Sequence, residues 1–116
     1  MPYNETIAER LREVLQQRVE VREQRMFGGL CFMLNGNMLC GVHRETLMFR
    51  VGKEQEATAL ARPGARPMDI TGRPMAGFVF VDPKACDKNA LRTWVALAEN
   101  YVGTLPHKAS AAAARP

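Results

Sequence analysis

The fold is decided by residues 25–51, which read RMFGGLCFMLNGNMLCGVHRETLMFRV. In this stretch Asn35-Gly36 separates two apolar segments, and the dipeptide is the strongest short-range signal of a β-hairpin with a two-residue loop. Such a loop fixes which residues lie opposite each other. The predicted pairs, counted outward from the loop, are Leu34 with Asn37, Met33 with Met38, Phe32 with Leu39, and Cys31 with Cys40. The last pair should point into a core that helices cover.

Helical and extended patterns continue on both sides of this hairpin. Asn4 can cap a first helix and Asp87 a last one, which Gly103 ends and Trp94 should anchor against the sheet. The other elements are expected as strands at 19–27, 30–34, 38–43, 46–51, 66–70 and 77–81, with a short helix at 53–61. This order, α-β(4)-α-β(1-2)-α, predicts an α+β fold of two layers, an antiparallel sheet with flanking helices. In this interpretation residues 1–103 form the domain and the alanine-rich residues 104–116 a disordered tail.

Length, composition and cysteine content indicate what class of protein the chain is. With 116 residues and 47% hydrophobic side chains, the chain can fold as one domain with its own core. Its three cysteines fit neither a disulfide framework nor a CxxC pair, so we expect a reduced, cytoplasmic protein. The N-terminal residues soon turn charged, and nowhere are there about 20 consecutive apolar residues, so we expect neither export nor a membrane segment.

The formal net charge of +4 raises the question of nucleic-acid binding. The charges are mixed, because acidic and basic residues lie side by side at 9–13 and most other arginines stand singly. The sequence has no compact basic block of the kind that marks a phosphate-binding patch. Binding to nucleic acid is therefore possible but not favoured.

The sequence contains no arrangement of residues that is typical of a catalytic or metal-binding site, and we assign no catalytic residue. Cys40 and His43 have the spacing of metal ligands, but residues three apart on a strand point to opposite faces, so we expect no metal and no cofactor. Cys86 precedes a helix, where the pKa of a thiol can be depressed, so it is a reactive-thiol candidate, with a buried loop cysteine as the alternative. For Cys31 and Cys40 we expect buried thiols, with a disulfide as the alternative.

One motif carries a resemblance to a known family. The motif is Arg25-Met26-Phe27-Gly28-Gly29, and an apolar strand, the hairpin and the segment LMFRV at 47–51 follow it. This succession resembles the start of the TfoX (Sxy) N-terminal domain, and the segment GRPM at 72–75 and the helix with Trp94 are similar to its single-domain members. The resemblance implies a two-layer domain of the secretion-chaperone-like type and, through full-length members, a link to the regulation of natural competence. It supplies no catalytic residue, and we expect a chain without the C-terminal helical domain of those regulators.

Both faces of the predicted sheet are apolar, and this is the main hint at function. The predicted register places one set beneath the helices, namely Cys31, Met33, Met38, Cys40, Val42, Leu47, Phe49 and Val51. The opposite face carries Leu30, Phe32, Leu34, Leu39 and Met48 beside His43, Thr46 and Arg50. A sheet covered on one side alternates apolar with polar residues, so a second apolar face needs a cover from the chain or from a partner. The many methionines, Met68 and Met75 among them, suit an adaptable binding surface.

These observations predict a non-catalytic protein-interaction or regulatory module rather than an enzyme. Its expected interaction face is Phe32, Leu39, Met48, His43 and Arg50. The expected partners are a second copy of the chain, giving a homodimer, and another protein that the sequence does not identify. Two other functions stay open. A nucleic-acid-associated transcriptional regulator would show a clustered basic patch, and a thiol-dependent enzyme or redox sensor would show cysteines of perturbed reactivity in a cleft.

Overall fold

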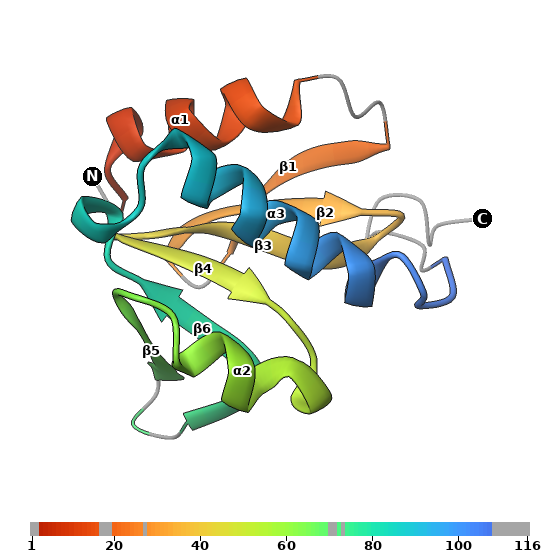
Figure 1. The fold of residues 1–116 in the computed structure, drawn as a ribbon. Coiled ribbons are helices and arrows are strands. Elements are labelled where there is room, and N and C mark those ends of the chain that lie inside the picture. Colours follow the sequence, from red (N-terminus) through yellow and green to blue (C-terminus); the bar gives the residue numbers. More distant parts are fainter. Residues whose placement is uncertain (1–2, 17–19, 27, 70–71, 73, 108–116) are drawn as a thin grey trace.

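The described part of the chain forms two layers, a sheet and the helices packed on it (Figure 1). The computed structural model describes residues 3–16, 20–26, 28–69, 72 and 74–107. Its helices are α1 (Glu5–Leu15), α2 (Glu56–Leu60) and α3 (Lys88–Val102), with the short 3₁₀ helices η1 (Lys53–Gln55) and η2 (Pro83–Ala85). Its strands are β1 (Val21–Met26), β2 (Gly29–Leu34), β3 (Asn37–His43), β4 (Thr46–Arg50), β5 (Ala65–Asp69) and β6 (Pro74–Val81). The predicted order of elements is confirmed in outline.

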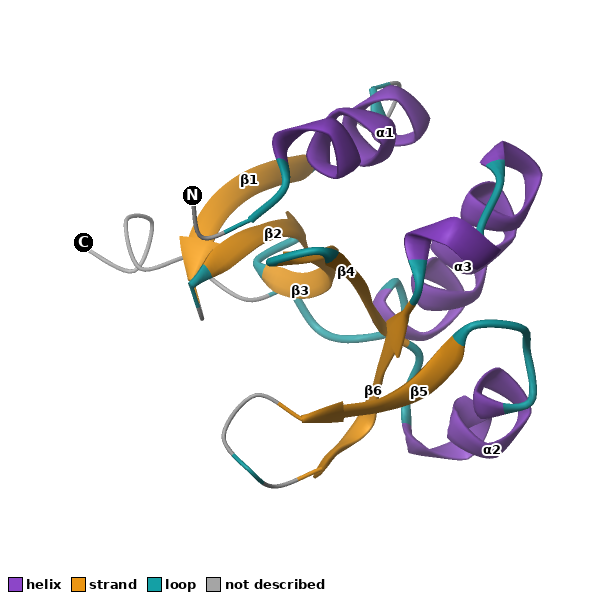
Figure 2. Cartoon of the chain, turned by 90° about the vertical axis from the view of Figure 1, so that its left-hand side faces the viewer, coloured by secondary structure: helices purple, strands orange, loops and turns teal. Residues whose placement is uncertain are grey.

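The six strands form one antiparallel sheet in the order β1-β2-β3-β4-β6-β5. The helices lie on one side of it, with α1 and α3 over the middle of the sheet and α2 near β5 and β6 (Figure 2). The predicted α+β fold is thus confirmed. Two boundaries differ, since the short helix begins as the 3₁₀ helix η1 and the last strand begins already at Pro74. Val19, Phe27 and Ile70, expected in strands, lie outside the described residues.

Both long helices begin where the sequence indicates. The side-chain oxygen of Asn4 accepts hydrogen bonds from the N–H groups of Thr6 and Ile7, at 2.8 and 3.2 Å. The carboxylate of Asp87 accepts one from the N–H of Ala90, at 2.8 Å. Each cap satisfies backbone donors that the first turn of a helix leaves free. No helix within the described ranges is long and apolar enough to cross a membrane.

The segment after α3 returns to the β2–β3 hairpin. The side-chain amide of Asn37, which is 8% exposed, donates a hydrogen bond of 2.9 Å to the carbonyl oxygen of Pro106. Leu105 packs against the core beneath the helices. Residues 108–116 lie outside the described residues, so a disordered tail stays a prediction for them.

The hairpin has the predicted loop but not the whole predicted register. Asn35 and Gly36 have φ values of 53° and 83°, as the tight two-residue turn requires. The two pairs next to the loop are confirmed. The register then shifts, because Leu39 is an extra residue in β3, and Phe32 lies opposite Cys40 instead of Leu39.

This bulge separates two of the cysteines. Cys31 lies opposite Gly41 and faces away from the helices, whereas Cys40 faces them, so the prediction that the two are cross-strand neighbours in one core is wrong. All three cysteines of the chain are free thiols and buried. The bulge lets the consecutive residues Leu39 and Cys40 both enter the core beneath the helices, and burial of a leucine side chain alone contributes about 1.5–3 kcal/mol.

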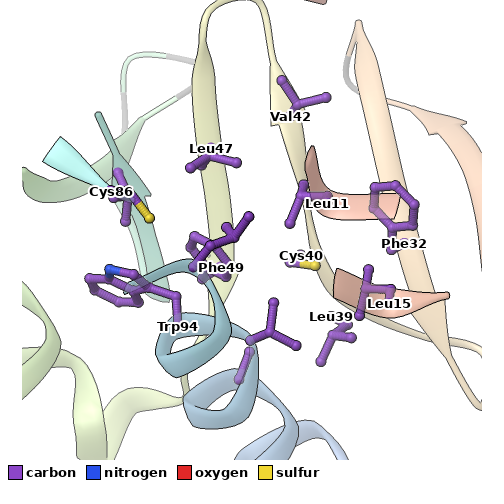
Figure 3. Close-up of a cluster of buried hydrophobic side chains, with 14 of the residues drawn as sticks. Leu11, Leu15, Phe32, Leu39, Cys40, Val42, Leu47, Phe49, Cys86 and Trp94 are labelled. Carbon is purple, nitrogen blue, oxygen red and sulfur yellow. The ribbon is translucent and has the colours of Figure 1, made fainter. Parts of the chain in front are cut away.

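The core beneath the helices, called here the helix-side core, is centred on the contact of α3 with the sheet (Figure 3). Trp94 of α3 is 2% exposed and stacks on Phe49 of β4, with ring centroids 5.3 Å apart. The predicted role of Trp94 as an anchor is confirmed. Phe32 and Leu39 also lie in this core, so their predicted place on the face opposite the helices is wrong. In a regular ladder Cys31 would lie opposite Cys40, and both would face the same side of the sheet. The extra residue instead puts Phe32 opposite Cys40, so the side chains of β2 point to the opposite side from the predicted one.

Candidate interaction surface

The sheet has a second apolar face that no described helix covers (Figure 2). We call it the helix-free face and define it by its cluster of side chains. The buried members are Cys31, Met38, Met48, Met68 and Phe80, and the half-buried members packed around them are Met26, Met33, Met75 and Phe78. They come from all six strands and from no helix. The sequence prediction that both faces of the sheet are apolar is therefore confirmed.

The centre of this face is buried although no described helix lies on it. Met48 and Met68 are both 0% exposed. Gly41 lies opposite Met48 in the neighbouring strand, and a Cβ atom at Gly41 would lie 3.0 Å from the terminal methyl of Met48. The absent side chain of Gly41 thus leaves the space that the thioether of Met48 fills. Flexible methionine side chains can fill such irregular spaces, which keeps the centre of the face closed while its half-buried rim stays adaptable.

Arginines surround the apolar cluster. Arg22 lies opposite Met33, Arg50 opposite Phe78, and Arg66 opposite Phe80. Residues directly opposite each other in a sheet share a face, so all three arginines belong to the helix-free face. The guanidinium carbon of Arg66 lies 4.8 Å from the centre of the Phe80 ring, and that of Arg50 lies 5.4 Å from the centre of the Phe78 ring. Arg22 and Arg66 are exposed, and Arg50 is half-buried.

Carboxylates do not balance these arginines on the same face. The described strands contain two carboxylates, Glu23 and Asp69. Glu23 points to the helix side, where its oxygens lie 2.7 and 3.0 Å from the guanidinium of Arg12 in α1. Asp69 accepts a hydrogen bond of 2.7 Å from the N–H of Gly72 in the β5–β6 connection. The helix-free face therefore presents an apolar centre with a basic rim.

The five residues of the predicted interaction face lie on two different sides of the sheet. Phe32 and Leu39 lie in the helix-side core, and Met48, His43 and Arg50 lie on the helix-free face. His43 is half-buried and stacks on Phe80, with ring centroids 6.0 Å apart. Its Nδ1 atom is buried and has no hydrogen-bond partner among the described residues. The single face of five residues is thus a wrong grouping, and contact of the remaining three with a partner stays a prediction.

The RMFGG motif supports the sheet and contributes one residue to its helix-free face. Met26 belongs to the half-buried rim, while Arg25 is exposed and lies opposite Leu30. Gly28 has a φ of 70°, and a Cβ atom at Gly29 would collide with the carbonyl oxygen of Val42. Phe27 lies outside the described residues. The motif is structural in these positions, and its glycines permit the close approach of β2 to β3.

Sequence reasoning missed Met26, Phe78, Arg22 and Arg66 as members of the helix-free face. The number of methionines could have indicated Met26, whereas Phe78 had no comparable signal. The arginines gave no signal, because they are far apart along the chain and only the order of the strands brings them to one face.

The three thiols are buried, and burial raises the pKa of two of them. Cys86 is 1% exposed, and burial raises its pKa, with Asp87 raising it further and Arg10 opposing these effects. The direction is opposite to the depressed pKa considered for Cys86, and a reactive thiol at this position stays a prediction. Burial also raises the pKa of Cys31 to about 11. Among the described residues, no group of three or more histidine, cysteine or acidic side chains is placed to hold a metal ion.

Comparison with known proteins gives one match. The model of a family described as the TfoX N-terminal domain matches residues 13–101. No curated protein and no solved structure matches the chain. The matched residues include every strand, the last turn of α1 and most of α3.

Proposed function

The chain belongs to the TfoX N-terminal domain family, and from this premise we propose that it is a non-catalytic protein-interaction module that acts as a regulator or adaptor. The observation that carries the proposal is the helix-free face, with its methionine and phenylalanine cluster and its basic rim. Half-buried methionines give a surface that can adjust to a bound segment. Charged groups around it give that segment an orientation.

The chemistry of this face selects the kind of partner. Apolar side chains on the partner would contact Met33, Met75 and Phe78, and carboxylates on the partner would pair with Arg22 and Arg66. A segment in which apolar and acidic residues alternate meets both conditions. Homodimerisation through the same face is less favourable, because it would bring the arginines of two copies together without carboxylates to balance them.

Synthetic peptides test this proposal directly. We would measure the anisotropy of a labelled peptide of about 12 residues in which leucine or methionine alternates with glutamate, beside a matched peptide with lysine in place of glutamate. The acidic peptide should bind and the basic one should not. The double variant Arg22→Glu/Arg66→Glu should weaken binding by about tenfold or more, since rim charges steer and orient the partner. Arg92→Glu makes the same kind of charge change on an exposed position of α3 and should leave binding within about twofold.

Three results would speak against the proposal. The first is equal binding of the acidic and basic peptides. The second is tight, salt-dependent binding of duplex DNA that exceeds peptide binding, which would favour the nucleic-acid alternative. The third is a wild-type protein that sediments as a dimer at micromolar concentration and dissociates in the Arg22→Glu/Arg66→Glu variant. That result would assign the helix-free face to a second copy of the chain.

A further inference from the structure

A pocket of about 750 Å³ lies where β4 ends, beside the start of η1, the first half of β6 and the C-terminal part of α3. Its volume is within the range of about 300–1,000 Å³ that is usual for small-molecule sites. Its lining combines apolar and polar groups, among them Arg50, Lys53, Phe78, Leu97, Asn100 and Tyr101. The centre of the helix-free face does not line this pocket, although Arg50 and Phe78 border both.

Arg50 is the group in this pocket that is best suited to bind a ligand. Its guanidinium carbon lies 5.4 Å from the centre of the Phe78 ring and 5.7 Å from the centre of the Tyr101 ring. It forms no ion pair with a carboxylate of the described residues. Aromatic faces hold the planar group by its charge and leave the N–H donors along its edge available. Two parallel donors of this kind match the two oxygens of a carboxylate.

Backbone hydrogen bonds and a close aromatic contact hold the wall of the pocket in place. The N–H groups of Val51 and Gly52 both donate to the carbonyl oxygen of Gly77, at 2.9 and 3.0 Å. The N–H of Gly77 donates in turn to the carboxylate of Glu56, at 2.8 Å. Gly52 has a φ of 86°, and a Cβ atom there would lie 2.5 Å from the ring of Tyr101. The aromatic ring therefore rests directly on the backbone, and a side chain at this position would displace it.

The charges of the lining limit the charge of the ligand. Arg50 and Lys53 are cations, and Glu54 is a carboxylate that lines the same pocket. The net positive charge of one suits a monoanion, whereas a phosphate monoester or a dicarboxylate would bring its second charge towards Glu54. Phe78, Leu97 and Tyr101 offer apolar surface beside Arg50.

We propose that this pocket binds a small monocarboxylate with an apolar, ring-sized body. Arg50 takes the carboxylate through two parallel hydrogen bonds, and the rings of Phe78 and Tyr101 and the side chain of Leu97 contact the body. The site shares Arg50 and Phe78 with the helix-free face, but it needs no part of a macromolecular partner, so ligand binding can be tested without the function proposed for that face.

Phenylacetate is the probe, and phenylacetamide is its neutral control of nearly equal shape. Titration into ¹⁵N-labelled protein should shift the backbone amide signals of Gly52, Gly77 and Tyr101, with a Kd on the order of 1 mM for so small a ligand. Phenylacetamide should bind at least about tenfold more weakly, because its amide cannot form a charge-assisted pair with Arg50. The same loss is expected for phenylacetate with Arg50→Met.

Three further variants, one of them a control, keep the test decisive if Arg50→Met does not fold. Asn100→Asp adds a carboxylate at an exposed position of the lining and should weaken phenylacetate binding, whereas Asn89→Asp, exposed at the start of α3, should not change it. Glu54→Gln removes the competing carboxylate and should strengthen binding. The proposal is overturned if phenylacetate shifts no signals of the pocket at about 20 mM, well above the expected Kd. It is equally overturned if phenylacetamide binds as well as phenylacetate, or if Asn100→Asp and Asn89→Asp behave alike.

Discussion

Replacement of Trp94 by alanine should remove much of the stability of the domain. The side chain is 2% exposed and lies between two partners, the Phe49 ring at 5.3 Å and the guanidinium of Arg62 at 5.7 Å. Truncation of a buried tryptophan to alanine costs about 3–5 kcal/mol through lost burial and the cavity left behind. Of that loss, about 0.5–1.5 kcal/mol comes from the stacked arrangement of the Trp94 and Phe49 rings. A domain of this size is stable by about 5–15 kcal/mol, so the variant should lose a large fraction of its stability.

The measurement is urea denaturation followed by circular dichroism. Fluorescence is unsuitable, because Trp94 is the only tryptophan of the chain and the variant lacks the signal. The difference in unfolding free energy between wild type and Trp94→Ala should be about 3–5 kcal/mol, with an unchanged dependence on urea concentration. Trp94→Phe serves as the matched control. It keeps an aromatic ring against Phe49 and should lose about half as much or less.

A double-mutant cycle isolates the contact with Arg62. Arg62→Met keeps most of the side-chain volume and removes the charge over the ring. The coupling energy between Trp94→Phe and Arg62→Met should be about 0.5–1 kcal/mol or smaller, as the guanidinium is half-buried. The reasoning is refuted if Trp94→Ala loses less than about 1 kcal/mol, the range of surface substitutions. Trp94 would then lie on the surface and α3 would be anchored by other residues.

Three further predictions concern other parts of the sheet. Leu39→Lys places a charge at a position that is 0% exposed and should unfold the domain, which circular dichroism would show; a folded variant of wild-type stability would instead put Leu39 on the surface. Arg12→Met removes the contact with Glu23 that joins α1 to β1 and the contacts with Glu5 and Glu9 within α1, and should cost about 1 kcal/mol in urea denaturation, less at high salt. The pKa of Cys31 is raised from 9.0 to about 11, so the folded state holds this proton more tightly than the unfolded chain; the unfolding free energy should fall as the pH rises from 9 to 11, and Cys31→Ala should show a smaller fall in the same denaturation series.

Short-range signals in the sequence predicted most of the architecture. Asn4 and Asp87 cap helices because their side chains reach backbone donors only a few residues away. Asn35-Gly36 makes the tight turn because both residues accept a positive φ. These features depend on neighbours along the chain, so the sequence alone is sufficient to locate them.

The orientation of the strands was harder to predict, for a physical reason. In a sheet that is apolar on both faces, alternation of residue type no longer distinguishes one face from the other. The bulge at Leu39 then changes the face of every residue of the hairpin on one side of it, and no residue type near Leu39 requires it. The predicted faces were therefore right for β4 and the outer part of β3, and inverted for β2 and for Met38 and Leu39 in the inner part of β3.

The candidate surfaces depend on contacts between distant segments. Arg22, Arg50 and Arg66 stand apart in the sequence, and the strand order β1-β2-β3-β4-β6-β5 places them on one face. The pocket beside Arg50 depends on Tyr101 of α3 resting on Gly52. Neither arrangement has a local signature, since each is a product of the tertiary packing.

Because β3 contains an extra residue, the hairpin has one position at which deletion of a single residue can be accommodated. If Leu39 is deleted, Met38 and Cys40 become neighbours and still point to opposite sides, as their partners Met33 and Phe32 do. The deletion restores a regular ladder, and Val42 and the rest of the strand keep their orientation at the expense of one buried side chain. Deletion of Phe32 cannot be accommodated in this way. It would turn the side chains in the remainder of β2 to the other face, so that Cys31 would point to the helices in place of the Phe32 ring. Length variation in this hairpin is therefore tolerated in one strand and not in the other.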